Sequence, residues 1–191
     1  MAMRGALRSQ LWDAWSQAIT NDYVRRRINS ERSLQASLWS QLNCILPDTR
    51  RMFVEPRVAL RTGGAVRRFY PDIVICSALQ VIAVVELKYQ PRGKPSYRKD
   101  LNTLQFISAN RAKLFVSNPR YLGERAAVKK YGFSKRTLFV WAGVHREEDS
   151  TGDIIDLPPL NAGIRELAGC FLELHAVTSS ADAPRVIARA N

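Results

Sequence analysis

The most hydrophobic segment of the chain, PDIVICSALQVIAVVELKY at residues 71–89, carries three charged side chains. Its two apolar runs predict neighbouring strands that a short connection around Leu79 joins into a hairpin. Asp72 opens the first run, and Glu86 and Lys88 close the second. Because burial penalises a charged group, these side chains need partners that compensate their charge.

Side chains alternate between the two faces of a strand, so this hairpin has one apolar face and one face that bears the charges. With the turn centred on Leu79, Asp72 lies directly opposite Glu86, whereas a slip of one residue would separate them. Two facing carboxylates repel each other, and a hard divalent cation such as Mg²⁺ is the natural compensation. Lys88 points to the same side, where it could activate water or neutralise charge on a phosphate. The alternative is a solvated strand end with a local ion pair.

Apolar patterns elsewhere predict helices before and after a run of strands. We expect helices at 4–20, at 30–46 with Ser30 as N-cap, and from Tyr97 onward. We expect strands at 52–62 with a break at Pro56, 66–77, 81–89, 136–145 and 170–177, and a turn at 63–64. Further expectations are a partly helical stretch at 119–135, an acidic loop at 146–153 and a short helix near 161–169. This order predicts an α/β or α+β fold with a mixed central sheet flanked by helices.

The second predicted helix offers a third carboxylate. Glu31 falls within the inward-facing stripe of Leu34, Leu38 and Leu42, so it could reach the charged end of the hairpin. The alternative is an acid that is favoured in the first helical turn by the helix dipole.

The net charge of +12 favours a polyanionic partner, with nucleic acid first and an anionic membrane second. Basic side chains that could contact phosphates are Arg92, Lys94, Arg98, Lys99 and Arg26. Contacts with phosphates do not distinguish one nucleotide sequence from another. The alternative for each of these residues is a solvated position in a loop.

Three cysteines lie far apart in the sequence, and Cys44 and Cys76 are expected to be buried thiols. This usage indicates a reducing compartment and a cytoplasmic protein. Isolated histidines make a zinc site improbable. We expect neither a membrane span nor a signal peptide.

Pro71-Asp72, the triplet Glu86-Leu87-Lys88 after an apolar strand, and a preceding helical glutamate together resemble the PD-(D/E)xK nuclease superfamily. The resemblance covers residues 28–145 and implies the restriction-endonuclease-like fold. It implies that Asp72, Glu86 and the Leu87 carbonyl bind Mg²⁺, with Mn²⁺ as a substitute, that Lys88 is catalytic and that Glu31 assists.

The resemblance also implies a metal-dependent endonuclease that hydrolyses phosphodiester bonds in DNA, and a homodimer would suit cleavage of both strands. We expect the nuclease-like domain at 28–177, preceded by a helix and basic connector at 1–27 and followed by a loose tail at 178–191. The alternatives are a non-catalytic nucleic-acid-binding or assembly subunit with this fold, and a nuclease that acts on RNA.

Overall fold

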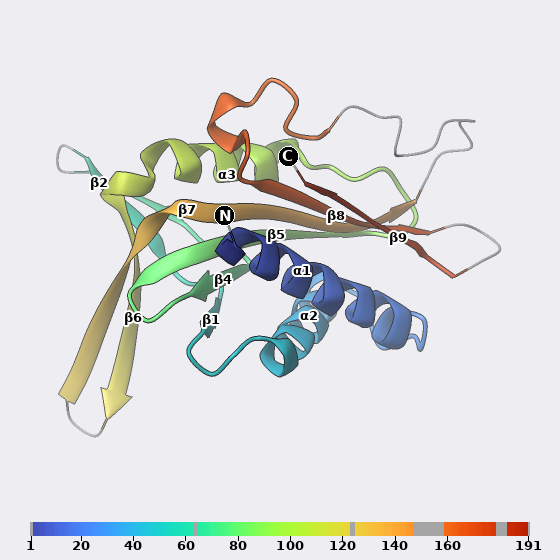
Figure 1. The fold of residues 1–191 in the computed structure, drawn as a ribbon, viewed down its shortest axis with the longest axis horizontal. Coiled ribbons are helices and arrows are strands. Elements are labelled where there is room, and N and C mark those ends of the chain that lie inside the picture. Colours follow the sequence, from blue (N-terminus) through green and yellow to red (C-terminus); the bar gives the residue numbers. More distant parts are fainter. Residues whose placement is uncertain (1, 63–64, 123–124, 147–158, 179–182, 191) are drawn as a thin grey trace.

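In a computed structural model, the chain forms a mixed β-sheet that helices cover on both faces (Figure 1). The structure describes residues 2–62, 65–122, 125–146, 159–178 and 183–190. The helical elements are α1 (Ala2–Gln17), the π-helix η1 (Ala18–Tyr23), α2 (Glu31–Ile45), α3 (Arg98–Asn110), and the 3-10 turns η2 (Arg111–Lys113) and η4 (Arg165–Leu167). The strands are β1 (Arg51–Val54), β2 (Val58–Thr62), β3 (Ala65–Phe69), β4 (Ile73–Cys76), β5 (Gln80–Gln90), β6 (Leu114–Leu122), β7 (Arg125–Arg146), β8 (Phe171–Thr178) and β9 (Arg185–Ala190).

The sheet divides at β7, which is 22 residues long. Its C-terminal half runs parallel to β5 on one side and to β8 on the other. β4 and β1 extend the sheet beyond β5 as antiparallel strands, and β9 closes the other edge against β8. The N-terminal half of β7 pairs with β6 in an arm that projects from the molecule, and β6 also pairs with the β2–β3 hairpin (Figure 1).

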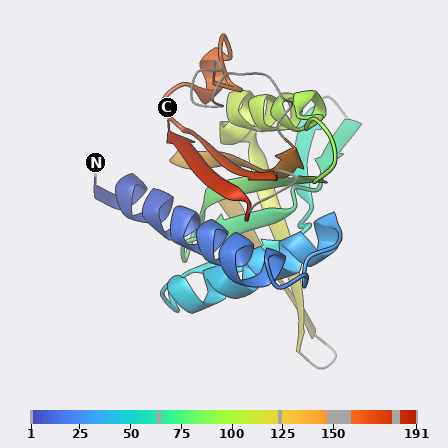
Figure 2. The ribbon, with the colours of Figure 1, turned by 90° about the vertical axis from the view of Figure 1, so that its right-hand side faces the viewer.

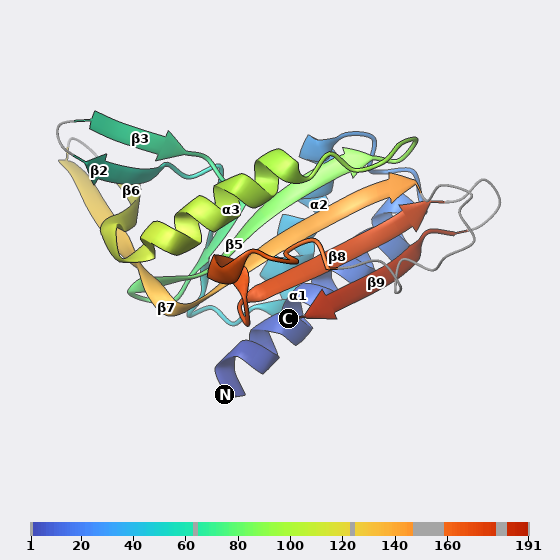
Figure 3. The ribbon, with the colours of Figure 1, turned by 90° about the horizontal axis from the view of Figure 1, so that it is seen from above.

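Each face of the sheet has its own hydrophobic core. α1 and α2 cover one face, and α3 covers the other (Figure 2). Trp15 of α1 and Leu38 of α2 are fully buried against the first face, and Leu104 of α3 is fully buried against the second. A fully buried leucine contributes roughly 1.5–3 kcal/mol, so these stripes hold the helices on the sheet. Figure 3 shows α3 crossing above β5 and β7. The expected α+β architecture, a mixed sheet flanked by helices, is confirmed.

The start of α2 matches the expectation at Ser30. The Ser30 hydroxyl accepts a hydrogen bond from Ser33 N at 3.2 Å, and Ser33 Oγ accepts one from Ser30 N at 3.0 Å. This reciprocal pair satisfies backbone N–H groups that the first helical turn leaves without partners. It therefore fixes the residue at which α2 begins, one position before Glu31.

Three expected elements are wrong, because partners distant in sequence decide them. The single strand expected at 66–77 is two strands, β3 and β4, which lie in different parts of the sheet. The partly helical stretch expected at 119–135 belongs instead to the paired strands β6 and β7. The tail expected to be loose contains β9, whose Ile187 pairs with His175 of β8.

Smaller expectations have mixed outcomes. The short helix expected at 161–169 is only the 3-10 turn η4. The turn at 63–64 and most of the acidic loop at 146–153 lie outside the described residues, although Thr62 and Ala65 do pair across a hairpin. All three cysteines are free thiols, and Cys44 is exposed rather than buried because it lies on the outer side of α2. Among the described residues, no helix has the length and apolarity needed to cross a membrane.

Candidate active site

The β4–β5 hairpin has the register expected from a turn centred on Leu79. Ile73 pairs with Val85, and this register continued by one residue places Asp72, which precedes β4, opposite Glu86. Ile73 and Val85 point into the core under α1 and α2, whereas Val84, on the face shared with Glu86, points toward α3. The hairpin therefore carries its two acids to the same end of the sheet, on the side that α3 covers.

The C-terminal part of β5 extends to Gln90, beyond Val85, which pairs with the first residue of the antiparallel strand β4, so β4 leaves this edge of β5 without a strand partner. Carboxylates accept the backbone hydrogen bonds that a neighbouring strand would otherwise accept there. Leu87 N donates a hydrogen bond to Asp72 Oδ2 at 2.6 Å, and Tyr89 N donates one to Glu31 Oε2 at 3.3 Å. Because unpaired backbone N–H groups are costly where they are buried, both acids have a structural role at this edge.

α2 brings Glu31 to the end of β5. Gln35, one turn further along α2, donates a hydrogen bond from Nε2 to the Asp72 carbonyl at 2.9 Å. The carboxylate of Glu31 lies 3.7 Å from Lys88 Nζ, and its side chain is 44% exposed. The structure thus places the helical acid beside the hairpin, as its position in the inward stripe predicted.

Asp100 is a fourth acid at this site, and the sequence analysis did not select it. Its Oδ2 lies 3.7 Å from Lys88 Nζ, so Lys88 is held between Glu31 and Asp100. Trp141 Nε1 donates a hydrogen bond to the same oxygen at 3.4 Å. The sequence does indicate that Asp100 faces inward, since it stands four residues before Leu104 on the inward face of the helix.

These groups line a pocket of about 370 Å³ between the end of β5, β3 and α3. Its lining residues are Glu31, Arg68, Phe69, Tyr70, Asp72, Glu86, Leu87, Lys88, Lys99, Asp100 and Thr103. Four of them are acids and three are bases. Arg68 and Tyr70 were not predicted as site residues, because only the fold brings β3 and the residue after it to the edge of this pocket.

Burial and mutual repulsion raise the pKa values of the acids in the pocket. Burial is the main cause at Glu86, whose pKa is raised to about 9, and the charges of Asp72 and Asp100 add to it. Burial also raises the pKa of Asp72 to about 6, against the opposing effect of the Leu87 hydrogen bond. The pKa of Asp100 is raised by burial, although Lys88 opposes the shift. Perturbed acids gathered in one cavity are typical of functional sites.

The residues present suit a divalent cation. Within the described part of the chain, the side chain of Glu86 forms no hydrogen bond and no ion pair within 4 Å, although other acids line the same pocket. The carbonyl of Leu87 points to the same edge as its N–H, because both groups of a strand residue project to one side. Oxygen ligands of these kinds are those that Mg²⁺ prefers. The described residues do not include three His, Cys, Asp or Glu side chains already grouped as a metal site.

The basic residues selected from the sequence separate into different places. Lys99 lines the pocket of the acids. Arg26 and Arg92 lie together at a second hollow, next to Tyr89. Lys94 and Arg98 line neither of these two hollows.

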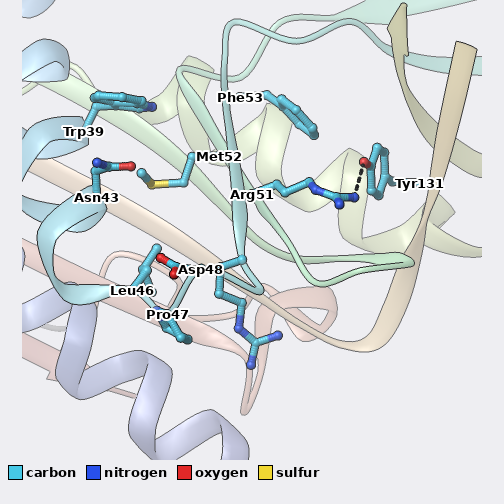
Figure 4. A pocket seen from close by; sticks show the side chains of 10 residues that line it. Trp39, Asn43, Leu46, Pro47, Asp48, Arg51, Met52, Phe53 and Tyr131 are labelled. Atoms are coloured by element: carbon cyan, nitrogen blue, oxygen red, sulfur yellow. Dashed lines mark hydrogen bonds between the residues drawn. The ribbon is translucent and has the colours of Figure 1, made fainter. Parts of the chain in front are cut away.

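A third hollow, also about 370 Å³, lies between the end of α2 and β1 (Figure 4). Arg51 Nη1 donates a hydrogen bond to Tyr131 Oη across one side of it at 3.1 Å. Asp48 is the acid in its lining, and none of the site residues predicted from the sequence lies there. The facing carboxylates and the lysine therefore single out the pocket at the end of β5.

Fold and pocket define an α+β protein with a carboxylate–lysine site at the open edge of its sheet. Comparison with family models, with curated proteins and with solved structures found no match. The geometry of this site is accordingly the basis on which we infer a function.

Proposed function

We propose that the protein is a metal-dependent nuclease with a restriction-endonuclease-like fold that hydrolyses phosphodiester bonds in DNA. One observation carries the proposal: Asp72, Glu86 and Lys88 line one pocket, in the register predicted for a shared cation site. The net charge of +12 supports a polyanionic substrate. This inference concerns the site, since α+β folds with similar layers host many activities.

Asp72, Glu86 and the Leu87 carbonyl would hold Mg²⁺, or Mn²⁺ in its place, and the bound cation would polarise the scissile phosphate and stabilise the leaving oxygen. Lys88 would face the same phosphate, and Glu31 and Asp100 hold its ammonium group at 3.7 Å each. A fixed ammonium group can orient the attacking water and offset the charge that develops on the phosphate. Glu31 and Asp100 would thus position Lys88 in the reaction.

A non-catalytic nucleic-acid-binding or assembly subunit is the second candidate. Asp72 and Glu31 accept hydrogen bonds from the backbone of β5, so a protein without catalytic activity would also need them for its fold. Glu86 distinguishes the two candidates. It is part-buried, its pKa is strongly raised, and it contributes no hydrogen bond within the described structure, so a binding module gains nothing from it.

Nicking of supercoiled plasmid DNA in Mg²⁺ or Mn²⁺, with EDTA as the metal-free arm, tests the proposal. We expect nicking by the parent protein and a loss of at least about a hundredfold in Glu86→Gln and Lys88→Met, as is usual when a group that acts on the transition state is removed. Asp100→Asn should lower the rate by less, because Lys88 keeps its contact with Glu31.

Arg165→Ala is the matched control, since it removes an exposed base from η4, outside the pocket. Equal activity in the parent, Glu86→Gln and Lys88→Met would exclude the nuclease proposal and leave the binding subunit. Competition between DNA and RNA substrates would separate a DNA nuclease from one that acts on RNA. Sedimentation of the parent protein would show whether it is the homodimer that cleavage of both strands favours.

A further inference from the structure

A second hollow, of about 730 Å³, lies next to the candidate active site, where β5 ends. It is lined by Tyr23, Val24, Arg26, Ile28, Asn29, Tyr89, Pro91, Arg92, Ala183 and Pro184. Its lining contains two arginines and no acid. A concave surface with this composition attracts an anion.

Arg26 occupies a strained backbone position at the rim of this hollow. Its φ angle is 60°, in the left-handed region where glycine is favoured. This conformation lies in the turn after η1, where Arg26 N donates a hydrogen bond to the Tyr23 carbonyl and Arg27 N donates one to the Asp22 carbonyl, both at 2.9 Å. Glycine would make the same turn without strain. Backbone strain of this kind is often found at functional positions.

Arg92 borders the hollow from a turn that several hydrogen bonds hold in place. Gly93 N donates to the Gln90 carbonyl at 3.0 Å, and Arg146 N donates to the Gly93 carbonyl at 3.1 Å. Ser96 N donates to Gln90 Oε1 at 2.8 Å. Hydrogen bonds therefore fix the backbone of both arginines, so that less conformational entropy is lost when a ligand binds.

The floor of the hollow connects it to the candidate active site. Tyr89 follows Lys88 on β5, and its N–H is bonded to Glu31. Its hydroxyl donates a hydrogen bond to the Ile28 carbonyl at 3.2 Å, and its ring meets Tyr23 edge to face, with 6.3 Å between ring centroids. Glu31 therefore links the two hollows, because its carboxylate contacts both Tyr89 N and Lys88 Nζ.

We propose that the hollow between Arg26 and Arg92 binds a backbone phosphate of the nucleic acid strand, beside the phosphate that the candidate active site would cut. This inference rests on the proposed function, because it assigns to the same substrate a second contact on the protein. The two guanidinium groups bind the phosphate oxygens, and the tyrosine rings form the wall on which the sugar lies. Contacts of this kind fix the position of the strand without reading its sequence.

Fluorescence anisotropy of a labelled 20-nucleotide strand and of its duplex, measured in EDTA, tests the site without catalysis. Arg26→Gly and Arg92→Ala should each weaken binding several-fold, and the double variant should weaken it at least about tenfold. Because both arginines bind the same phosphate, loss of this contact in the double variant should reduce the slope of log K against log salt concentration by about 0.7 for the single strand and 0.9 for the duplex. Arg26→Gly should also melt at a higher temperature than the parent protein, since it removes the backbone strain.

Arg165→Ala again serves as the control, since it removes one positive charge from the face that α3 covers. Equal affinity and equal salt slope in the parent and the double variant would overturn the inference, as would an equal loss in Arg165→Ala. Binding to phosphatidylserine vesicles that depends on both arginines, with unchanged oligonucleotide affinity, would also overturn it. If the double variant changes the salt slope but the parent never nicks plasmid, the phosphate site stands and the nuclease proposal fails.

Discussion

Replacing Glu86 by glutamine should stabilise the metal-free protein, and the gain should depend on pH. The pKa of Glu86 is about 9 in the folded state and 4.5 in its ordinary environment. The folded protein therefore keeps a proton that the unfolded chain releases, and stability falls as pH rises from 4.5 toward 9. Glutamine resembles the protonated side chain at every pH, so Glu86→Gln loses this dependence.

The magnitude follows from the two pKa values. A difference in pKa is worth about 1.4 kcal/mol for each pH unit. Between pH 4.5 and pH 7, the parent protein therefore loses about 3 kcal/mol of unfolding free energy that Glu86→Gln keeps. Below pH 4.5 the difference should vanish, because Glu86 is then protonated in both states.

Urea unfolding in EDTA at pH 4, 5.5, 7 and 8 measures this difference. Asp13→Asn is the control, because it makes the same change from acid to amide at an exposed position on α1. Saturating Mg²⁺ should raise the stability of the parent protein, by about 2.7 kcal/mol at one hundred times Kd, and should raise that of Glu86→Gln much less. A variant less stable than the parent at pH 8, or a difference that stays constant from pH 4 to pH 8, would refute the reasoning.

Two further predictions concern packing and thiols. Gly143→Ala should lower the unfolding free energy by about 1–3 kcal/mol in urea, because its Cβ would lie 2.7 Å from Trp141 Cζ2. The control Gly132→Ala meets nothing within 4 Å, and an equal loss there would contradict this reason. Ellman's reagent at pH 8 should modify only Cys44 quickly, because Cys76 and Cys170 are buried and the pKa of Cys76 is raised to about 12. Three fast-reacting thiols in the native protein would contradict it.

The parts of the fold that local patterns determine could be predicted from the sequence. The apolar runs on either side of Leu79 are long enough to fix the register that brings Asp72 opposite Glu86. The cap at Ser30 and the apolar stripe after it fix the start and the inner face of α2. The position of Glu31 on that face could be predicted in the same way, because it follows from helical periodicity.

The parts that depend on distant partners could not be predicted. β9 is a short strand without a buried residue, and it forms because it pairs with β8, so its sequence alone resembles a loose tail. The arm of β6 and β7 is basic and weakly periodic, and its pairing across the arm decides its structure. The inward position of Asp100 on α3 follows from helical periodicity, but its contact with Lys88 depends on how α3 packs on the sheet, which no local pattern contains.

The hydrogen bonds that Asp72 and Glu31 accept from the backbone of β5 have an evolutionary consequence. If the proposed nuclease function holds, a descendant without that activity would still use Asp72 and Glu31 to pair the backbone of β5. Selection would no longer retain Glu86, whose replacement is expected to stabilise the metal-free protein, so Glu86 would be among the first of these side chains to diverge. In a set of homologues, the glutamate beside Lys88 would then mark the lineages that remain active, whereas the aspartate would persist in both kinds.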